Sequence, residues 1–208
     1  MTKIIENGNI ILTDSECFDI ALCLDCGQAF RWKQDENGVW HGVAHGKSLR
    51  LKQDGTTITF FDTTEEDFNN IWIKYFDLER NYGEILSSYN DESLVKACKA
   101  YPGIRILKQD EWEAVCSFII SANNNIPRIK GIIERFCESF GDDTGDGYSF
   151  PKPENIASLT VEELAPIRSG FRAKYIIDAA QKIASGEVDI EKIKKLPFEG
   201  SCHAQRRD

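Results

Sequence analysis

Two short segments of the chain combine side chains that can recognise a nucleotide with residues that hold a backbone in place. Residues 27–32 read GQAFRW, and residues 121–128 read SANNNIPR. Each segment puts amides and an arginine, which can pair with the polar edges of a base, beside aromatic or apolar anchors. The pattern is suited to holding the edges of a nucleotide while a core keeps the element rigid.

Gly27 stands at the start of the first segment, between Cys26 and a β-prone run. Its plain role is a turn or bulge where a side chain would clash. The same property lets a backbone carbonyl or amide approach a ligand closely. Phe30 and Trp32 alternate around Arg31, which favours a strand with anchored aromatic residues.

Three asparagines, residues 123–125, follow an apolar helical run and precede Pro127, which is favoured in the first turn of a helix. Capping alone explains one asparagine in such a place. Three in a row exceed that need. A hairpin tipped with amides and followed by Arg128 could enter a duplex and fill the space left by an extruded base.

A third segment, residues 168–175, reads RSGFRAKY. Phe171 can wedge against stacked bases, and Arg172 can donate two parallel hydrogen bonds to an orphaned base. The alternative is a helix start with a basic surface.

The net charge of −9 opposes binding to nucleic acid, but it is unevenly distributed. Residues 1–100 carry −7 and residues 101–208 carry −2. A basic face is therefore expected only in the second half, unless these charges are simply solvated. Its candidate members are Arg105, Lys108, Arg128, Lys130, Arg135, Arg168, Arg172 and Lys174.

The three segments, in this order, resemble those of the 8-oxoguanine DNA glycosylase family, and the resemblance covers residues 8–199. It implies double-stranded DNA containing an oxidised purine, 8-oxoguanine opposite cytosine, as the partner. It also implies that the Gly27 carbonyl reads the N7 hydrogen of the lesion. The implied lesion-recognition residues are Gly27, Gln28 and Phe30, and the implied contacts to the estranged cytosine are Asn123, Arg128, Phe171 and Arg172. Phe171 replaces the family's usual tyrosine and lacks its hydroxyl.

Base excision explains why such residues coexist, because the nucleotide must leave the stack at a cost that wedge and plug residues offset. In the family a lysine then displaces the base and forms a Schiff base with the sugar, and an aspartate assists. The family's Gly-Val-Gly-x-Lys-Val-Ala hairpin and Pro-Val-Asp stretch have no match here. Residues 200–208 are expected to be a non-native tail from a frameshift or truncation. Lys192, Lys194 and Lys195 are expected to lie on a charged helix surface and to attack poorly.

The expected fold class is α+β, in two parts. Residues 1–100 should form a twisted antiparallel sheet with helices, similar to the TATA-binding-protein-like module of the family, with a strand meander over 28–61 and an apolar helical stripe over 68–76. Residues 101–199 should form an incomplete all-helical glycosylase domain, with helical stripes over 112–119, 129–136 and 175–183. A Thr-x-x-Glu capping box at Thr160 predicts a short helix through Leu164.

Other candidate sites are weak. Cys23 and Cys26 have C-x-x-C spacing without a second pair, and His41 and His45 are expected to be packing or surface residues. We therefore predict no metal and no cofactor. The seven scattered cysteines indicate reduced thiols, and the chain shows no signal peptide or membrane span, which predicts a cytoplasmic monomer without membrane contact, nucleoid-associated if bacterial.

Three functions remain open from the sequence. The chain is a purine-lesion glycosylase and abasic-site lyase by descent that is inactive alone, a non-catalytic nucleic-acid-binding module, or an unstable fragment. In the last case Ile176, Ala180 and Ile183 are expected to be exposed.

Overall fold

The computed structural model describes residues 1–196 and has the expected α+β class. Six strands form one antiparallel sheet in the order β1-β2-β6-β5-β4-β3. Their bounds are β1 Thr2–Glu6, β2 Asn9–Thr13, β3 Trp32–Gln34, β4 Trp40–Ala44, β5 Lys47–Asp54 and β6 Thr57–Phe61. The meander expected over residues 28–61 is confirmed as β3 to β6.

The first two strands were not predicted, although the chain carries a signal for them. Asn7 and Gly8 both have positive φ, 51° and 77°, and join β1 to β2. An Asn-Gly pair between β-prone runs is a strong hairpin signal because both central residues of a type I′ turn need positive φ. β1 is exposed along its whole length and forms one edge of the sheet.

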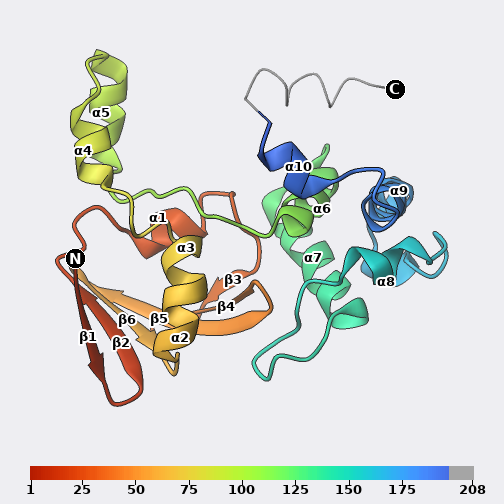
Figure 1. Ribbon diagram of the computed structural model, residues 1–208, viewed down its shortest axis with the longest axis horizontal. Coiled ribbons are helices and arrows are strands. Elements are labelled where there is room, and N and C mark those ends of the chain that lie inside the picture. Colours follow the sequence, from red (N-terminus) through yellow and green to blue (C-terminus); the bar gives the residue numbers. More distant parts are fainter. Residues whose placement is uncertain (197–208) are drawn as a thin grey trace.

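One helical segment covers the sheet (Figure 1). It runs through α2 Glu65–Asp67, a π-helical turn Phe68–Trp72 and α3 Ile73–Tyr75. The expected stripe is confirmed, since Phe68, Trp72, Tyr75 and Phe76 are all buried. With α1, Ile20–Leu24, they complete the first hydrophobic core against the inner face of the sheet.

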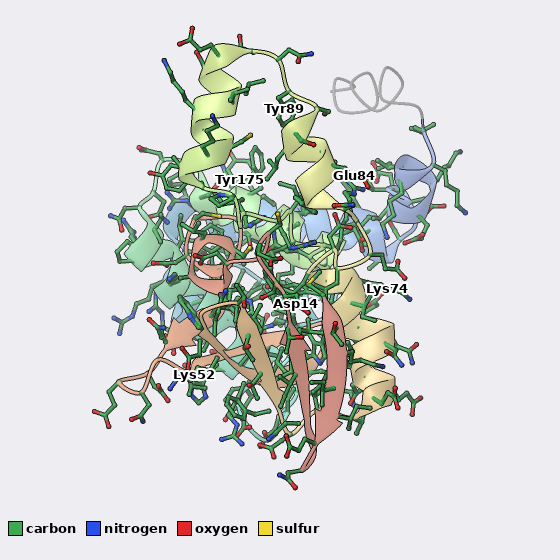
Figure 2. All side chains as sticks on the ribbon, turned by 90° about the vertical axis from the view of Figure 1, so that its left-hand side faces the viewer. Asp14, Lys52, Lys74, Glu84, Tyr89 and Tyr175 are labelled. Carbon is green, nitrogen blue, oxygen red and sulfur yellow. The ribbon has the colours of Figure 1, made fainter. Side chains whose placement is uncertain are left out.

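Two helices, α4 Tyr82–Ser87 and α5 Glu92–Ala100, stand away from the rest of the molecule. Figure 2 shows them from the side, with Tyr89 between them and far from the sheet. No residue of α5 is buried. This pair of helices, the hairpin of α4 and α5, therefore contributes little to either core.

The second half is helical in its described part, apart from one isolated bridge between Asp143 and Tyr148. Its elements are α6 Glu111–Ser121, α7 Ile126–Phe140, α8 Pro153–Ala157, the 3-10 turns Ala165–Ile167 and Gly170–Arg172, α9 Ala173–Ala184 and α10 Ile190–Lys194. Helices α6 to α9 enclose a second core that includes Phe136, Ile132 and Ile176. This core begins at Trp112, while Leu107 still belongs to the first core; the division expected at residue 100 stays a prediction.

The capping box at Thr160 forms, but the helix expected after it does not. Thr160 N donates to Glu163 Oε2 over 2.8 Å, and Glu163 N donates to Thr160 Oγ1 over 3.3 Å. Residues 161–164 then form turns, and a 3-10 helix follows. Pro166 explains the difference, because it disfavours α-helical geometry at the residue before it and supplies no backbone donor.

Candidate nucleic-acid interface

The structure brings the first two segments together. Gly27 adopts a φ of +88°, in the region that favours glycine. A Cβ built on Gly27 would lie 3.7 Å from Cδ1 of Ile126, the first residue of α7. The turn that precedes β3 therefore lies against the start of the helix that follows the asparagines.

Gln28 forms hydrogen bonds that hold this turn in place. Its Nε2 donates to the carbonyls of Cys23, over 3.0 Å, and Arg105, over 2.9 Å, and its Oε1 accepts from Leu107 N over 3.1 Å. Gln109 Nε2 donates to the Gln28 carbonyl over 2.5 Å. The side-chain amide of Gln28 is thus hydrogen-bonded to the backbone, and its expected role in recognising a lesion stays a prediction. We assign the Gln28 side chain to bracing Gly27.

The aromatic residues of the first segment are anchors, as expected from their alternation. Trp32 is buried, and its Nε1 donates to the Tyr75 hydroxyl over 2.8 Å. Phe30 is partly buried and packs against the second core. The segment from Phe30 to Trp32 therefore joins the two cores, and a role of Phe30 in lesion recognition stays a prediction.

Between Phe30 and Trp32, Arg31 forms a buried ion pair across the same junction. Its Nη1 lies 3.4 Å from Oε2 of Glu113 in α6, and its Nη2 donates to the Tyr148 carbonyl. The two side chains are 9% and 10% exposed. Burial raises the pKa of Glu113 to about 7, and the attraction of Arg31 only partly offsets that effect. Glu113 also lines a cavity of about 780 Å³, which none of Gly27, Asn123, Arg128 and Phe171 lines.

We expect Glu113 to make stability fall as pH rises from about 4.5 to about 7. In this window the unfolded chain has lost the proton of Glu113, whose ordinary pKa is 4.5, while the folded protein still holds it. Unfolding therefore releases a proton, and the free energy of unfolding falls by about 3 kcal/mol across the window. Urea unfolding of wild type and Glu113→Gln at several pH values measures this difference, since glutamine cannot titrate. Glu134→Gln, at an exposed pair with Lys33, is the control and should show no such difference.

Two of the three asparagines are caps. Asn124 Nδ2 donates to the Ile120 carbonyl over 3.0 Å, and Asn125 caps α7 by accepting from Arg128 N over 3.0 Å. Asn123 is exposed, with a left-handed φ of +49° that asparagine tolerates. Among the described residues its side chain forms no hydrogen bond, so it is the asparagine at this tip that a ligand can reach.

Arg128 and Phe171 are exposed, as a role in contacting a duplex requires. The side chain of Arg128 forms no ion pair with the described residues, whereas Lys130 pairs with Asp25 over 2.7 Å. Phe171 is 58% exposed. Whether they contact DNA stays a prediction that this geometry permits.

Arg172 is buried, and its expected contact with the estranged cytosine stays a prediction. It is 3% exposed, and its guanidinium donates to the carbonyls of Ala122, Asn123 and Ser169. A direct contact with an orphaned base would require these hydrogen bonds to break. In this structure Arg172 acts on the protein backbone.

The expected basic face is smaller than the count of residues suggested. Arg105 is buried and donates to the carbonyls of Cys17 and Asp77, and Arg135 donates to the Ile167 carbonyl. A planar guanidinium can donate hydrogen bonds to several backbone carbonyls at once, which explains why arginines are buried in this fold. Arg128, Arg168, Lys108 and Lys174 stay exposed.

The exposure of apolar side chains that was expected for an unstable fragment is wrong for the three residues named. Ile176 and Ala180 are fully buried in the second core, and Ile183 is partly buried against it. The exposed aromatic residue that the sequence analysis missed is Phe118, 81% exposed in α6. A signal existed, because Phe118 lies two residues from both Cys116 and Ile120, and this spacing puts it on the opposite side of the helix from the face that they form.

The remaining polar candidates have structural partners. His41 Nε2 lies 3.0 Å from Asp35, and His45 Nε2 lies 2.8 Å from the Lys108 carbonyl. Cys23 is buried and accepts from Arg105 N over 3.2 Å, and burial raises its pKa to about 12. No group of three or more metal-ligand side chains occurs within residues 1–196. Six cysteines in this range are unpaired; Cys202 lies outside it.

Lys194, near the end of the described chain, is held as an ammonium by two carboxylates. Lys194 lies 2.6 Å from Glu111 and 2.7 Å from Glu191, and these carboxylates raise its pKa. A protonated ammonium has no free electron pair with which to attack a sugar. The predicted non-native tail, residues 200–208, lies outside the described residues.

Residues 116–207 match the family model described as HhH-GPD superfamily base excision DNA repair protein. Fold and match thus define a protein of that superfamily. Residues 10–115, about half of the chain, match the model described as 8-oxoguanine DNA glycosylase, N-terminal domain. The chain belongs to the 8-oxoguanine DNA glycosylase family.

Individual relatives also support membership of this family. The N-glycosylase/DNA lyase of Saccharomyces cerevisiae is 33% identical over an alignment of 202 residues, and this alignment covers 88% of this chain and 54% of the yeast protein. The chain spans about half the length of the curated relatives it matches. The apo structure of Clostridium acetobutylicum 8-oxoguanine glycosylase/lyase has a TM-score of 0.90 and 37% identity, over 98% of this chain and 73% of that one. Its complex with double-stranded DNA containing cytosine opposite 8-oxoG also has a TM-score of 0.90, at 36% identity, over 98% of this chain and 72% of that one.

No helix among residues 1–196 has the length and apolar character needed to span a bilayer.

Proposed function

We propose that this chain recognises an oxidised purine, 8-oxoguanine opposite cytosine, in double-stranded DNA for base excision repair. The observation that carries the proposal is the contact between two segments far apart in sequence. The Gly27 turn lies against Ile126, directly beside the exposed tip at Asn123. The edge of an extruded purine would then face the Gly27 turn, and the gap that it leaves in the duplex would face the neighbouring tip at Asn123.

Each exposed group has a proposed task. The Gly27 backbone reads the purine edge, Asn123 and Arg128 contact the base left behind, and Phe171 wedges against the stack. The solved relative with cytosine opposite 8-oxoG supports this choice of duplex. We further propose that the chain binds as a monomer.

We also propose that no amine among residues 1–196 attacks the sugar, so that these residues recognise the lesion without cleaving the strand. The ion pairs that keep Lys194 protonated support this part. Borohydride trapping on an 8-oxoguanine:cytosine duplex tests it, because borohydride reduces a Schiff base to a stable adduct. Absence of an adduct, with trapping by an active glycosylase in parallel, is expected. An adduct would show that an amine of this chain reacts.

Arg128→Ala is expected to weaken duplex binding about tenfold, since a charged hydrogen bond to DNA is lost. The slope of log affinity against log salt should also become shallower by about one. Fluorescence anisotropy with 8-oxoguanine:cytosine and guanine:cytosine duplexes, at two salt concentrations, measures both.

Lys52→Ala is the charge-matched control, because Lys52 lies on the sheet away from Tyr175 and α9 (Figure 2). It should leave affinity nearly unchanged. If Arg128→Ala and Phe171→Ala both bind as tightly as wild type, the proposed surface is not the DNA-binding surface.

A further inference from the structure

The tip between α6 and α7, residues 122–125, is called the asparagine hairpin below. Helix α6 ends in it without a glycine, and side chains satisfy the last carbonyls of the helix. Ser121 Oγ donates to the Phe118 carbonyl over 2.7 Å, and Asn124 Nδ2 donates to the Ile120 carbonyl over 3.0 Å. These bonds are local, and they leave the carbonyls of the hairpin itself without a partner from α6.

Arg172 supplies the partner from a distant part of the chain. Its Nε donates to the Ala122 carbonyl over 3.0 Å, and its Nη2 donates to the carbonyls of Ala122, over 2.5 Å, and Asn123, over 3.0 Å. A cation beside the carboxyl end of a helix is also favoured by the helix dipole. Because Asn123 is held in left-handed geometry, an external clamp on its carbonyl stabilises a conformation that most residues avoid.

The same guanidinium contacts the exposed wedge. The Arg172 Cζ atom lies 4.5 Å from the centroid of the Phe171 ring. This distance is within the range of a cation–π interaction. One buried group therefore touches both the hairpin that presents Asn123 and the ring that stands out beside it.

We propose that Arg172 is a positioning residue that joins the asparagine hairpin and Phe171 into one rigid unit. Plug and wedge then reach a duplex together, already ordered, so less conformational freedom is lost on binding. This inference rests on the proposed function for its purpose, but the clamp exists without DNA and can be tested without it.

Hydrogen exchange in the free protein is the first test. Arg172→Ala removes the clamp, and Arg172→Lys keeps the charge but loses the planar fork. Both changes should raise amide exchange in residues 119–126 about tenfold or more. Arg168→Ala, at an exposed arginine in the same segment, is the matched control and should leave exchange unchanged.

Duplex binding provides the second test. With Arg172 present, Asn123→Ala and Phe171→Ala should each weaken binding about fivefold, and together about fivefold and not about 25-fold, because they disrupt one unit. In the Arg172→Lys background the two fivefold losses of affinity should multiply to about 25-fold. Unchanged exchange with reduced affinity in both Arg172 variants would overturn the proposal and assign Arg172 to DNA contact alone. If the wild-type chain binds no duplex, the proposed function fails while the exchange result still decides the clamp.

A measurement on the wild type covers the case in which the variants do not fold. The Nε–H of a clamped Arg172 should exchange with water at least about tenfold more slowly than that of exposed Arg168 in proton–nitrogen spectra. Equal rates would show that the guanidinium is free, and would overturn the clamp.

Discussion

Glu113→Leu is expected to lower the free energy of unfolding by about 4 kcal/mol, among the largest effects of a single change in this chain. The change leaves the Arg31 guanidinium buried with the Tyr148 carbonyl as its remaining partner. Arginine cannot relieve this by losing its proton, and removing one member of a buried ion pair costs about 3–5 kcal/mol. Urea unfolding at pH 7.5 measures it.

Removing Arg31 in place of Glu113 should lower the free energy of unfolding by less. In Arg31→Met the remaining Glu113 can take up a proton, because its pKa is already raised to about 7. We expect a loss of about 3 kcal/mol at pH 7.5, shrinking at pH 6. The double variant Arg31→Met/Glu113→Leu should lose less than either single one, since no charge is left buried. Additive losses would mean that the pair does not act as a unit.

Gly42→Ala is expected to destabilise the fold by about 3 kcal/mol, the upper part of the usual range for overpacking. Gly42 lies opposite Trp32 in the pairing of β3 with β4. A Cβ at this position would overlap the indole, with Cζ3 at 2.8 Å. The ring cannot move away easily, because it is buried and hydrogen-bonded to Tyr75.

Gly131→Ala is the matched control for that change. Gly131 lies inside α7, where the nearest atom to a Cβ is Arg135 Nη1 at 3.3 Å, and a shift of a few tenths of an ångström relieves this contact while Nε and Nη2 keep their hydrogen bonds to the Ile167 carbonyl. Alanine in a helix interior is favoured over glycine by about 0.5–1 kcal/mol. Thermal unfolding should therefore move in opposite directions for the two variants, and a Gly42→Ala protein as stable as wild type would refute the packing argument.

The sequence allowed the meander, the stripe over 68–76 and the helices of the second half to be predicted, because each depends on local periodicity. It also identified Asn123, Arg128 and Phe171, which the structure leaves exposed. A local sequence pattern can identify residues of this kind when their side chains are exposed to solvent.

The roles of Gln28 and Arg172 could not be predicted in the same way. A glutamine or arginine binds a ligand or a carbonyl with the same donors, and only the tertiary fold decides which carbonyls lack partners. Arg172 meets the Ala122 carbonyl 50 positions away. The ion pair of Arg31 and Glu113, 82 positions apart, was missed for the same reason.

The hairpin of α4 and α5 has a consequence for how the molecule opens. α5 buries no side chain and its ion pair of Lys96 with Glu92 is exposed, so little free energy opposes its separation from the body. Such a unit unfolds locally, at a free energy well below that of global unfolding, while the sheet and the second core stay intact. Within residues 1–196, we therefore expect a protease to find an unfolded backbone first around Tyr89, and an inserted sequence to be tolerated best there.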